Sequence, residues 1–314
     1  MLFFCGDVMS VFLSLFFNLL PLYALIGAGY IAGKFLHVDR QSLGTLAMYI
    51  FMPVVMFGFV SSLDFKPSYI ALPFILYGIS AFVALSFLKL GQHVYGDNQA
   101  NLMAMCAAMG NTGYFGFPLV LLFFSKELVA IYIFMNLGSL IFEATIGYYI
   151  AARGNFDVRT SLNKIIKFPT IYAIALGLVV NQSGAELPDI FWTYWTHFKG
   201  AYVVVGMMII GAALSNLDKF VFGLRFVALT FAGKFIVWPL IAFAFIIFDR
   251  MVLHLFNEDI HNLIMIVSIV PSGANIAAFA TQMKLEPEKA ATTILLGTIF
   301  ALFYIPLMIW ILGI

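Results

Sequence analysis

The stretch GNTGYFGFP, residues 110–118, stands in the middle of an apolar segment that is long enough to cross a membrane. A second apolar segment carries the run PSGAN, residues 271–275. Glycine and proline interrupt helices and leave backbone N–H and C=O groups without partners, and hydrocarbon offers none. Such a run is stable inside a membrane only where protein buries it or a polar cavity adjoins it. A pair of these runs in matching places therefore predicts the binding site of a transporter.

The composition around these runs is that of a membrane protein. Of the 314 residues, 63% are hydrophobic and 10% are charged, which is too apolar for a soluble globular protein. A helix needs about 20 apolar residues to cross a hydrocarbon core of about 30 Å. The apolar stretch nearest the N-terminus, residues 11–33, is expected to be retained as a helix and not to be cleaved as a signal peptide. Ten spans are predicted, at residues 11–33, 42–63, 69–90, 101–124, 128–150, 166–184, 192–216, 220–248, 262–284 and 290–313.

The basic residues predict how these spans are oriented. Loops after odd-numbered spans hold eleven of the sixteen Lys and Arg residues, and loops after even-numbered spans hold three. Because basic loops stay in the cytoplasm, the loops after odd-numbered spans are expected there, with both chain ends outside. The strongest basic cluster lies between spans five and six. It divides the chain into residues 1–150, a cytoplasmic linker at 151–165, and residues 166–314. Five spans per half predict an inverted-topology repeat.

The two breaks would present ends of half-helices at the middle of the bilayer. A free helix N-terminus carries about half a positive charge and can bind a carboxylate without a full cation in lipid. Amide and hydroxyl side chains would add hydrogen bonds, and glycines would let the backbones approach. The alternative is that the prolines only kink packed helices. The candidate residues are Asn111, Thr112, Gly113, Gly116, Pro118, Pro271, Ser272, Gly273 and Asn275.

Among the ionisable residues inside predicted spans, two stand out by their depth: Glu143 late in span five and Lys234 near the middle of span eight. Charges at such depth are costly and are functional candidates by default. The two residues could form an ion pair. Alternatively, Glu143 carries a coupling proton or lies at the membrane interface, and Lys234 attracts an anionic substrate.

Other residue patterns exclude some functions. The two cysteines and five histidines show no ligand spacing, so no metal site is expected. No nucleophile with a base at a workable spacing lies among the spans, which argues against an enzyme. Gly29 and Gly33 in span one are one helical turn apart and predict a small-residue face for close helix packing.

At the two breaks the chain resembles the auxin efflux carrier family, which includes plant auxin exporters and many bacterial permeases. The fourth-span signature of that family is similar to Asn111-Thr112 followed by Gly116-Phe117-Pro118-Leu119, and the ninth-span signature to Pro271-x-Gly273 with Phe279-Ala280. Matches near the start and at the end of the chain extend the resemblance over essentially its whole length.

The resemblance implies an all-α fold of ten helices in two inverted five-helix repeats, like the bile acid and sodium symporters, with helices four and nine crossing near their prolines. It also implies a scaffold part that dimerises and a transport part that moves across it. By resemblance, Asn111, Asn275 and Asn136 contact the anion. Asn275 stands where the plant proteins carry an apolar residue, so a small mono- or dicarboxylate is expected in place of an indole acid.

We therefore expect a membrane transporter of a small organic anion in a bacterial inner membrane, working by an elevator-type movement and exporting its substrate. Because the cell interior is negative, anion export needs no coupling ion. The first rival is a sodium- or proton-coupled importer, and the second is a channel or a sensor that does not transport. No cofactor other than such a coupling ion is expected. The expected partners are the substrate, membrane lipid and a second copy of the chain, and not nucleic acid.

Overall fold

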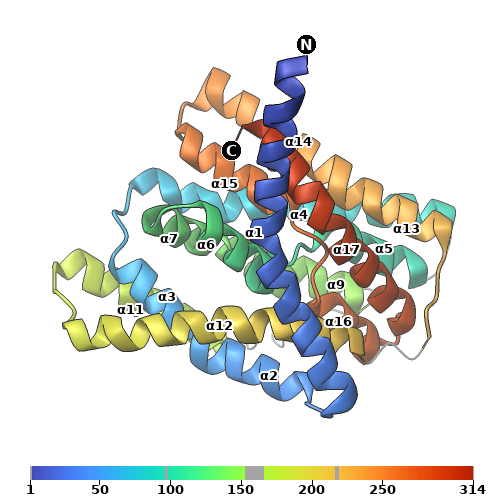
Figure 1. Cartoon of the computed structure of the whole chain (residues 1–314), viewed down its shortest axis with the longest axis horizontal. Coiled ribbons are helices and arrows are strands. Elements are labelled where there is room, and N and C mark those ends of the chain that lie inside the picture. The colour runs from blue at the N-terminus through green and yellow to red at the C-terminus, as the bar shows by residue number, and fades with distance from the viewer. Residues whose placement is uncertain (1, 96–97, 153–165, 216–218, 314) are drawn as a thin grey trace.

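The computed structural model describes residues 2–95, 98–152, 166–215 and 219–313, with the side chains of residues 2–11 left out of the description (Figure 1). The described residues form helices and turns, with a single isolated β-bridge and no β-strand. The expectation of an all-α protein is confirmed. The basic linker predicted at 151–165 lies almost entirely outside the described residues.

The helical elements follow the predicted spans in order. Most are α-helical, η2 is a short 3₁₀ helix, and the other η segments are π-helical turns. The first half contains α1 (Leu2–Phe35), α2 (Arg40–Leu46), η1 (Ala47–Phe51), α3 (Met52–Ser61), η2 (Pro67–Ile70), α4 (Ala71–Val94), α5 (Asn98–Ala108), η3 (Thr112–Gly116), α6 (Phe117–Phe123), α7 (Lys126–Met135), α8 (Leu137–Phe142), η4 (Glu143–Gly147) and α9 (Tyr148–Ala151). The second half contains α11 (Pro169–Ser183), α12 (Asp189–Ser215), α13 (Leu224–Phe231), η5 (Ala232–Val237), α14 (Trp238–Phe248), η6 (Asp249–Leu253), α15 (Glu258–Ile269), α16 (Asn275–Met283) and α17 (Pro287–Leu312).

Among the described residues, seven continuous helical stretches are long and apolar enough to cross a membrane. They correspond to predicted spans one, two, three, five, seven, eight and ten. The other three predicted spans contain shorter helices. Span six is α11, with 15 residues, whereas spans four and nine are each divided in two, as α5 with α6 and as α15 with α16.

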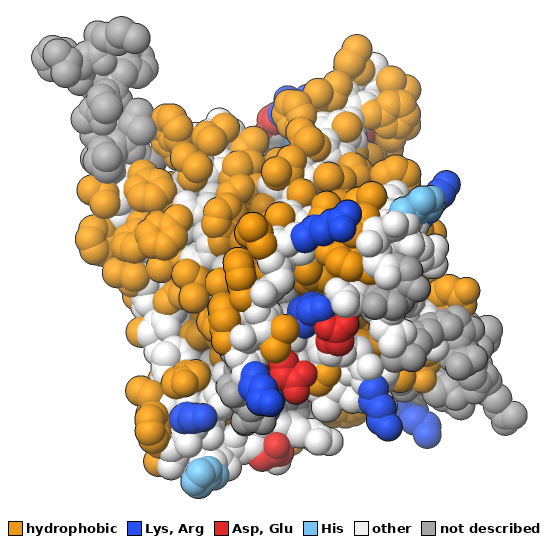
Figure 2. All heavy atoms as spheres, turned by 90° about the vertical axis from the view of Figure 1, so that its right-hand side faces the viewer, with side chains coloured by type: hydrophobic (Ala, Val, Ile, Leu, Met, Phe, Trp, Pro, Cys, Tyr) orange, Lys and Arg blue, Asp and Glu red, His pale blue; other side chains and the backbone are white. Residues whose placement is uncertain are grey.

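The surface is that of a protein surrounded by lipid. Phe74 is 69% exposed, Phe17 60% and Leu240 59%. Figure 2 shows hydrophobic side chains over most of the upper and middle parts of one face, with most of the charged side chains in its lower half and a few higher up. An apolar belt of this kind is stable in hydrocarbon and would aggregate in water.

Two groups of helices can be distinguished by their packing. We call α1, α2, η1, α3, α11 and α12 the first helix group, and the remaining helices the second helix group. Within the first group, α11 packs along α3, and the Asn181 side chain donates to the carbonyl oxygens of Ser61 and Leu63, at 3.2 and 2.6 Å. The Trp195 indole donates to the Val55 carbonyl oxygen at 3.2 Å. The long helices α1 and α12 cross in Figure 1.

Glycines allow the close contact between α1 and α12. A Cβ atom on Gly29 would lie 2.1 Å from the Met208 carbonyl oxygen, and one on Gly211 would lie 1.9 Å from the Ile26 carbonyl oxygen. Gly33 faces the same helix, at Ser215. The small-residue packing face predicted at Gly29 and Gly33 is confirmed.

The α1–α12 contact predicts a difference between two glycines of the same helix. Gly29→Ala should destabilise the protein by about 1 to 3 kcal/mol, because the added methyl group forces the helices apart. Gly27→Ala is the matched control, since a Cβ there meets nothing within 4 Å. Thermal unfolding in detergent measures both. Equal melting temperatures for the two variants would contradict the packing.

Candidate functional site

The two breaks meet each other inside the protein. Gly110 and Ser272 form an antiparallel β-bridge, the only isolated one among the described residues. The Asn111 N–H donates to the Pro271 carbonyl oxygen at 2.7 Å, and the Gly273 N–H donates to the Met109 carbonyl oxygen at 2.9 Å. The unwound backbone of each helix is thus hydrogen-bonded by the other, which meets the requirement of a membrane interior without water.

Side chains satisfy further carbonyl groups at the end of α5. The Ser272 hydroxyl donates to the Cys106 carbonyl oxygen at 2.7 Å, and the Trp238 indole donates to the Ala108 carbonyl oxygen at 3.1 Å. Ser272 and Trp238 are buried. Ser272 therefore joins the two breaks, and its hydroxyl is already used by the protein.

A side chain also donates a hydrogen bond to a carbonyl group in the first turn after the break in span four. The buried Tyr132 hydroxyl, on α7, donates to the Thr112 carbonyl oxygen at 2.7 Å. A Cβ on Gly116 would lie 2.2 Å from that hydroxyl oxygen, so only glycine lets α7 approach η3 so closely. Gly116 was expected to let the two crossing helices approach each other, and in the structure its nearest contact is with α7.

The crossing point differs in one respect from the expectation. The helices cross at Pro271 in span nine, as expected, but at Gly110 in span four. Pro118 lies further along, in the first turn of α6. A Cβ on Gly110 would lie 3.0 Å from Val270 and 3.2 Å from the Lys234 amino nitrogen. The lack of a side chain at Gly110 therefore allows the two broken helices to meet at this position.

The crossing separates two kinds of helix end. The helices α5 and α15 end there with carbonyl groups, whereas η3 and α16 begin there with N–H groups. Lys234, which is 1% exposed, donates from its amino group to the Ser268 carbonyl oxygen at 3.3 Å and lies 5.0 Å from the centre of the Trp238 ring. An amino group is a hydrogen-bond donor, so Lys234 satisfies a carbonyl group near the end of α15, on that side of the crossing.

A small cavity of about 30 Å³ adjoins the crossing, with room for about one water molecule. Asn111 and Asn136 are each 4% exposed, and the Nδ2 atom of Asn111 and the Oδ1 atom of Asn136 have no hydrogen-bond partner. A buried polar atom without a partner costs about 1 to 3 kcal/mol. The cavity is lined by Met48, Met52, Gly110, Asn111, Thr112, Gly113, Tyr114, Asn136, Ser139, Leu140, Glu143, Tyr202, Gly273 and Asn275.

Glu143 lies on this cavity and contacts the other break. Its carboxylate accepts a hydrogen bond from the Asn275 amide at 3.3 Å. The ion pairs among the described residues do not include a Glu143–Lys234 pair, because Glu143 faces the cavity and Lys234 faces the end of α15. Glu143 begins the π-helical turn η4 and Lys234 lies in the π-helical turn η5. Such turns are frequent at functional sites.

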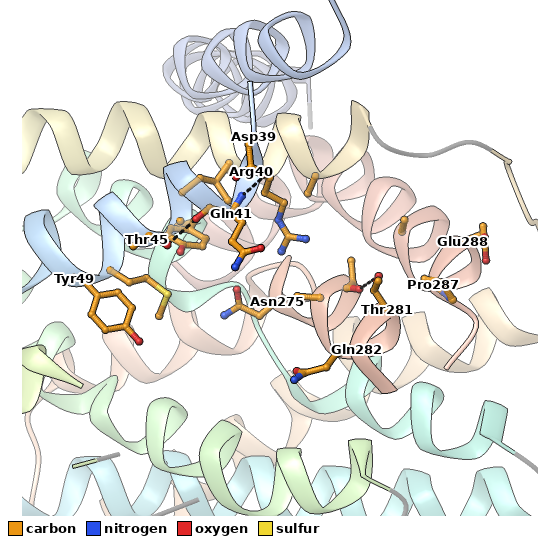
Figure 3. Close-up of a pocket in the computed structure, with 18 residues that line it drawn as sticks. Asp39, Arg40, Gln41, Thr45, Tyr49, Asn275, Thr281, Gln282, Pro287 and Glu288 are labelled. Atoms are coloured by element: carbon orange, nitrogen blue, oxygen red, sulfur yellow. Dashed lines mark hydrogen bonds between the residues drawn. The ribbon is translucent and has the colours of Figure 1, made fainter. Parts of the chain in front are cut away.

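A wide cavity of about 890 Å³ lies next to the small one. Met48, Tyr114 and Asn275 line both cavities, so these three residues lie between them. Figure 3 shows the wide cavity between α2 and α16, with Arg40 and Gln41 pointing towards α16. Arg40 donates from Nη2 to the Ala274 carbonyl oxygen at 3.0 Å. It thereby links the first helix group to the break in span nine.

Asp39 holds the start of α2 at the rim of the wide cavity. Its carboxylate accepts hydrogen bonds from the Gln41 and Ser42 N–H groups and from the Ser42 hydroxyl, at 2.8 to 3.2 Å. These bonds, of which the one from the Ser42 hydroxyl matters most, lower the pKa of Asp39 below its ordinary value. Asp39 therefore stays ionised at neutral pH, as a helix cap that positions Arg40.

The structure brings most of the candidate residues together. Asn111, Thr112, Gly113, Asn136, Gly273 and Asn275 line the small cavity, and Ser272 lies beside it with its hydroxyl bonded to Cys106. Sequence reasoning missed Arg40, which was assigned to a loop, and did not single out Tyr114, in the first break, or Tyr202, in span seven. It also missed the buried contact between His261 Nε2 and the Asp249 carboxylate at 2.9 Å, which holds the loop between η6 and α15.

A family model described as membrane transport protein matches residues 14–309, nearly the whole chain. The chain belongs to this family. The match confirms the resemblance to the auxin efflux carriers. The chain is also similar to an uncharacterized transporter of Methanocaldococcus jannaschii, which is 26% identical over 300 residues, covering 92% of this chain and 96% of the relative. The protein is thus an integral membrane transporter, and neither description names a substrate.

The bond between Ser272 and Cys106 predicts a structural role for a residue that was expected to bind substrate. Ser272→Ala should lower stability by about 1 to 3 kcal/mol, because a buried carbonyl loses its donor. Substrate affinity should change little. Ser86→Ala, at an exposed position of α4, is the control. Thermal unfolding and ligand binding in detergent test this, and a loss of affinity at unchanged stability would instead place Ser272 against the substrate.

Proposed function

We propose that this family member is a secondary transporter of a small organic anion, and that the carboxylate of the substrate binds in the small cavity at the crossing. One observation carries the proposal. The Asn111 amide is a buried hydrogen-bond donor without a partner, on the side where η3 and α16 begin. A carboxylate would supply the missing acceptor and would be stabilised by the nearby helix N-termini.

The proposal includes the architecture implied by the family resemblance. Residues 1–150 and 166–314 would be two inverted five-helix repeats, the second helix group would move across the first, and the first group would form the contact in a homodimer. The wide cavity is lined by residues at the loops after spans one and nine. Because those loops are expected in the cytoplasm, the conformation would face inward. An anion leaving from there gains about 2.3 kcal/mol per charge for each 100 mV of membrane potential.

A second candidate is an importer that couples the anion to a proton or a sodium ion. It is favoured by the acceptor atoms on the small cavity, namely the Glu143 carboxylate and the unpartnered Oδ1 atom of Asn136. An anion placed beside an ionised Glu143 would be repelled, and a proton or a cation bound there would remove the repulsion. Inward movement of an anion against the potential needs such coupling.

Asn111 provides the test of the binding site. Asn111→Ala should weaken carboxylate binding about tenfold or more, because a hydrogen bond to a charged group contributes about 1.5 to 3 kcal/mol. Asn262→Ala, near the opposite end of α15, should bind normally. Counterflow of labelled carboxylates in proteoliposomes measures both variants. Unchanged affinity in Asn111→Ala would remove this residue from the site.

Glu143 distinguishes the two candidate functions. If a proton is coupled to transport, Glu143→Gln should abolish uptake driven by an imposed pH gradient while leaving exchange of the anion intact. Glu127→Gln, at an exposed position in the first turn of α7, is the control. If flux in the wild type follows only the membrane potential and Glu143→Gln behaves like the control, potential-driven export is supported.

A further inference from the structure

The chain between α12 and α13 carries an exposed apolar run. Residues 219–225, which read KFVFGLR, are called the connecting segment below. Phe220 is 56% exposed, Phe222 55% and Leu224 71%, and the two phenyl rings stack with their centres 6.3 Å apart. Apolar surface of this kind is unfavourable in water. The side chains of the connecting segment therefore favour a place against lipid or against another protein.

The backbone of the same segment excludes the hydrocarbon core of a membrane. Residues 219–223 lie before α13 and are not helical. Their backbone has two of the described hydrogen bonds. The Val221 N–H donates to the Thr292 hydroxyl at 3.2 Å, and the Gly223 carbonyl oxygen accepts from the Val227 N–H at 2.9 Å. The backbone groups without such a bond need water, which hydrocarbon does not supply. Exposed rings and a hydrated backbone are both stable at the membrane–water interface.

The connecting segment lies at the end of the molecule that is expected in the cytoplasm, because it follows the odd-numbered span seven. In Figure 1 the trace that leads to α13 runs along the right-hand edge of the molecule, and Figure 2 views the molecule from that side. Figure 2 shows several Lys and Arg side chains near hydrophobic ones there. The cytoplasmic leaflet contains anionic lipids, and these attract basic residues at its surface.

Two basic residues, Lys219 and Arg225, stand at the ends of the apolar run. Both are exposed, and neither belongs to an ion pair between described residues. The preceding acid, Asp218, lies outside the described part of the chain. The guanidinium carbon of Arg225 lies 5.9 Å from the centre of the Tyr95 ring, which follows α4. Lysine binds a phosphate as a point charge and arginine as a planar fork of donors.

We propose that the connecting segment is an interfacial binding site for an anionic phospholipid. The acyl chains pack against Phe220 and Phe222, and the phosphate is bound by Lys219 and Arg225. Charge and apolar area together favour a lipid, since a free phosphate would leave the rings exposed. The segment joins α12 of the first helix group to α13 of the second, so the lipid binds at a link between the two groups. This inference does not depend on which substrate is transported.

Quenching of fluorescence by brominated lipids tests the proposal at the segment itself. Phe222→Trp places an indole in the apolar run, and its signal is the difference from the same protein with Phe222 in place, which contains four tryptophans. The protein is reconstituted in phosphatidylcholine with increasing fractions of brominated phosphatidylglycerol or brominated phosphatidylcholine. The phosphatidylglycerol should reach half of its maximal quenching at a mole fraction at least about fivefold lower, since one basic residue near an anionic surface contributes about that factor. With Lys219→Gln and Arg225→Gln added, the two lipids should quench alike.

A matched control removes the same charge elsewhere. Lys66→Gln with Lys126→Gln changes two exposed lysines at the loops after spans two and four, expected on the opposite face, and should keep the preference. Thermal unfolding checks that each variant is folded. Equal quenching by both lipids with Lys219 and Arg225 present, or an unchanged preference without them, would overturn the inference.

The remaining outcomes concern other occupants of the segment. If neither lipid quenches the indole, the apolar run lies in water or against another protein chain, and the lipid site is overturned. Soluble glycerol phosphate should not change the quenching. If it removes the preference for phosphatidylglycerol, Lys219 and Arg225 bind a free anion and the lipid site is likewise overturned. Each of these results leaves the proposed transport function standing.

Discussion

The structure depends on the hydrogen bonds that the two broken helices exchange at Gly110 and Ser272. Inside a membrane, an unwound backbone has no water to bind, so each break is stable only because the other supplies donors and acceptors. Other carbonyl groups at the breaks accept hydrogen bonds from buried side chains of other helices, such as Trp238 and Tyr132. The crossing and the packing around it therefore stabilise each other, and neither half of the chain could form the site alone.

Polar side chains gather around the same crossing. Near the end of α15, the Ser268 carbonyl oxygen accepts a hydrogen bond from Lys234, and just before η3 the Asn111 amide is a donor without a partner. Glu143 and Arg40 contact the break in span nine from different sides, through Asn275 and Ala274. Any movement of this break would change both contacts at once.

The sequence was sufficient for the coarse description of the molecule. Apolar segments and their glycine and proline runs predicted an all-α membrane protein with two broken spans, and the spacing of Gly29 and Gly33 predicted a helix contact. The crossing point in span four was not predictable, because it depends on the space around Gly110 and not on Pro118. The partners of Lys234 and Ser272 and the role of Arg40 arise from contacts between distant segments, which local sequence patterns do not encode.

The most direct test of the account is a density map of the protein in a lipid nanodisc, with bound carboxylate, at a resolution that shows side chains. If the two breaks form the binding site, spans four and nine are interrupted, their breaks touch, and ligand density lies against the Asn111 amide. Continuous helices, breaks that lie apart and face lipid, or a ligand bound elsewhere would contradict it.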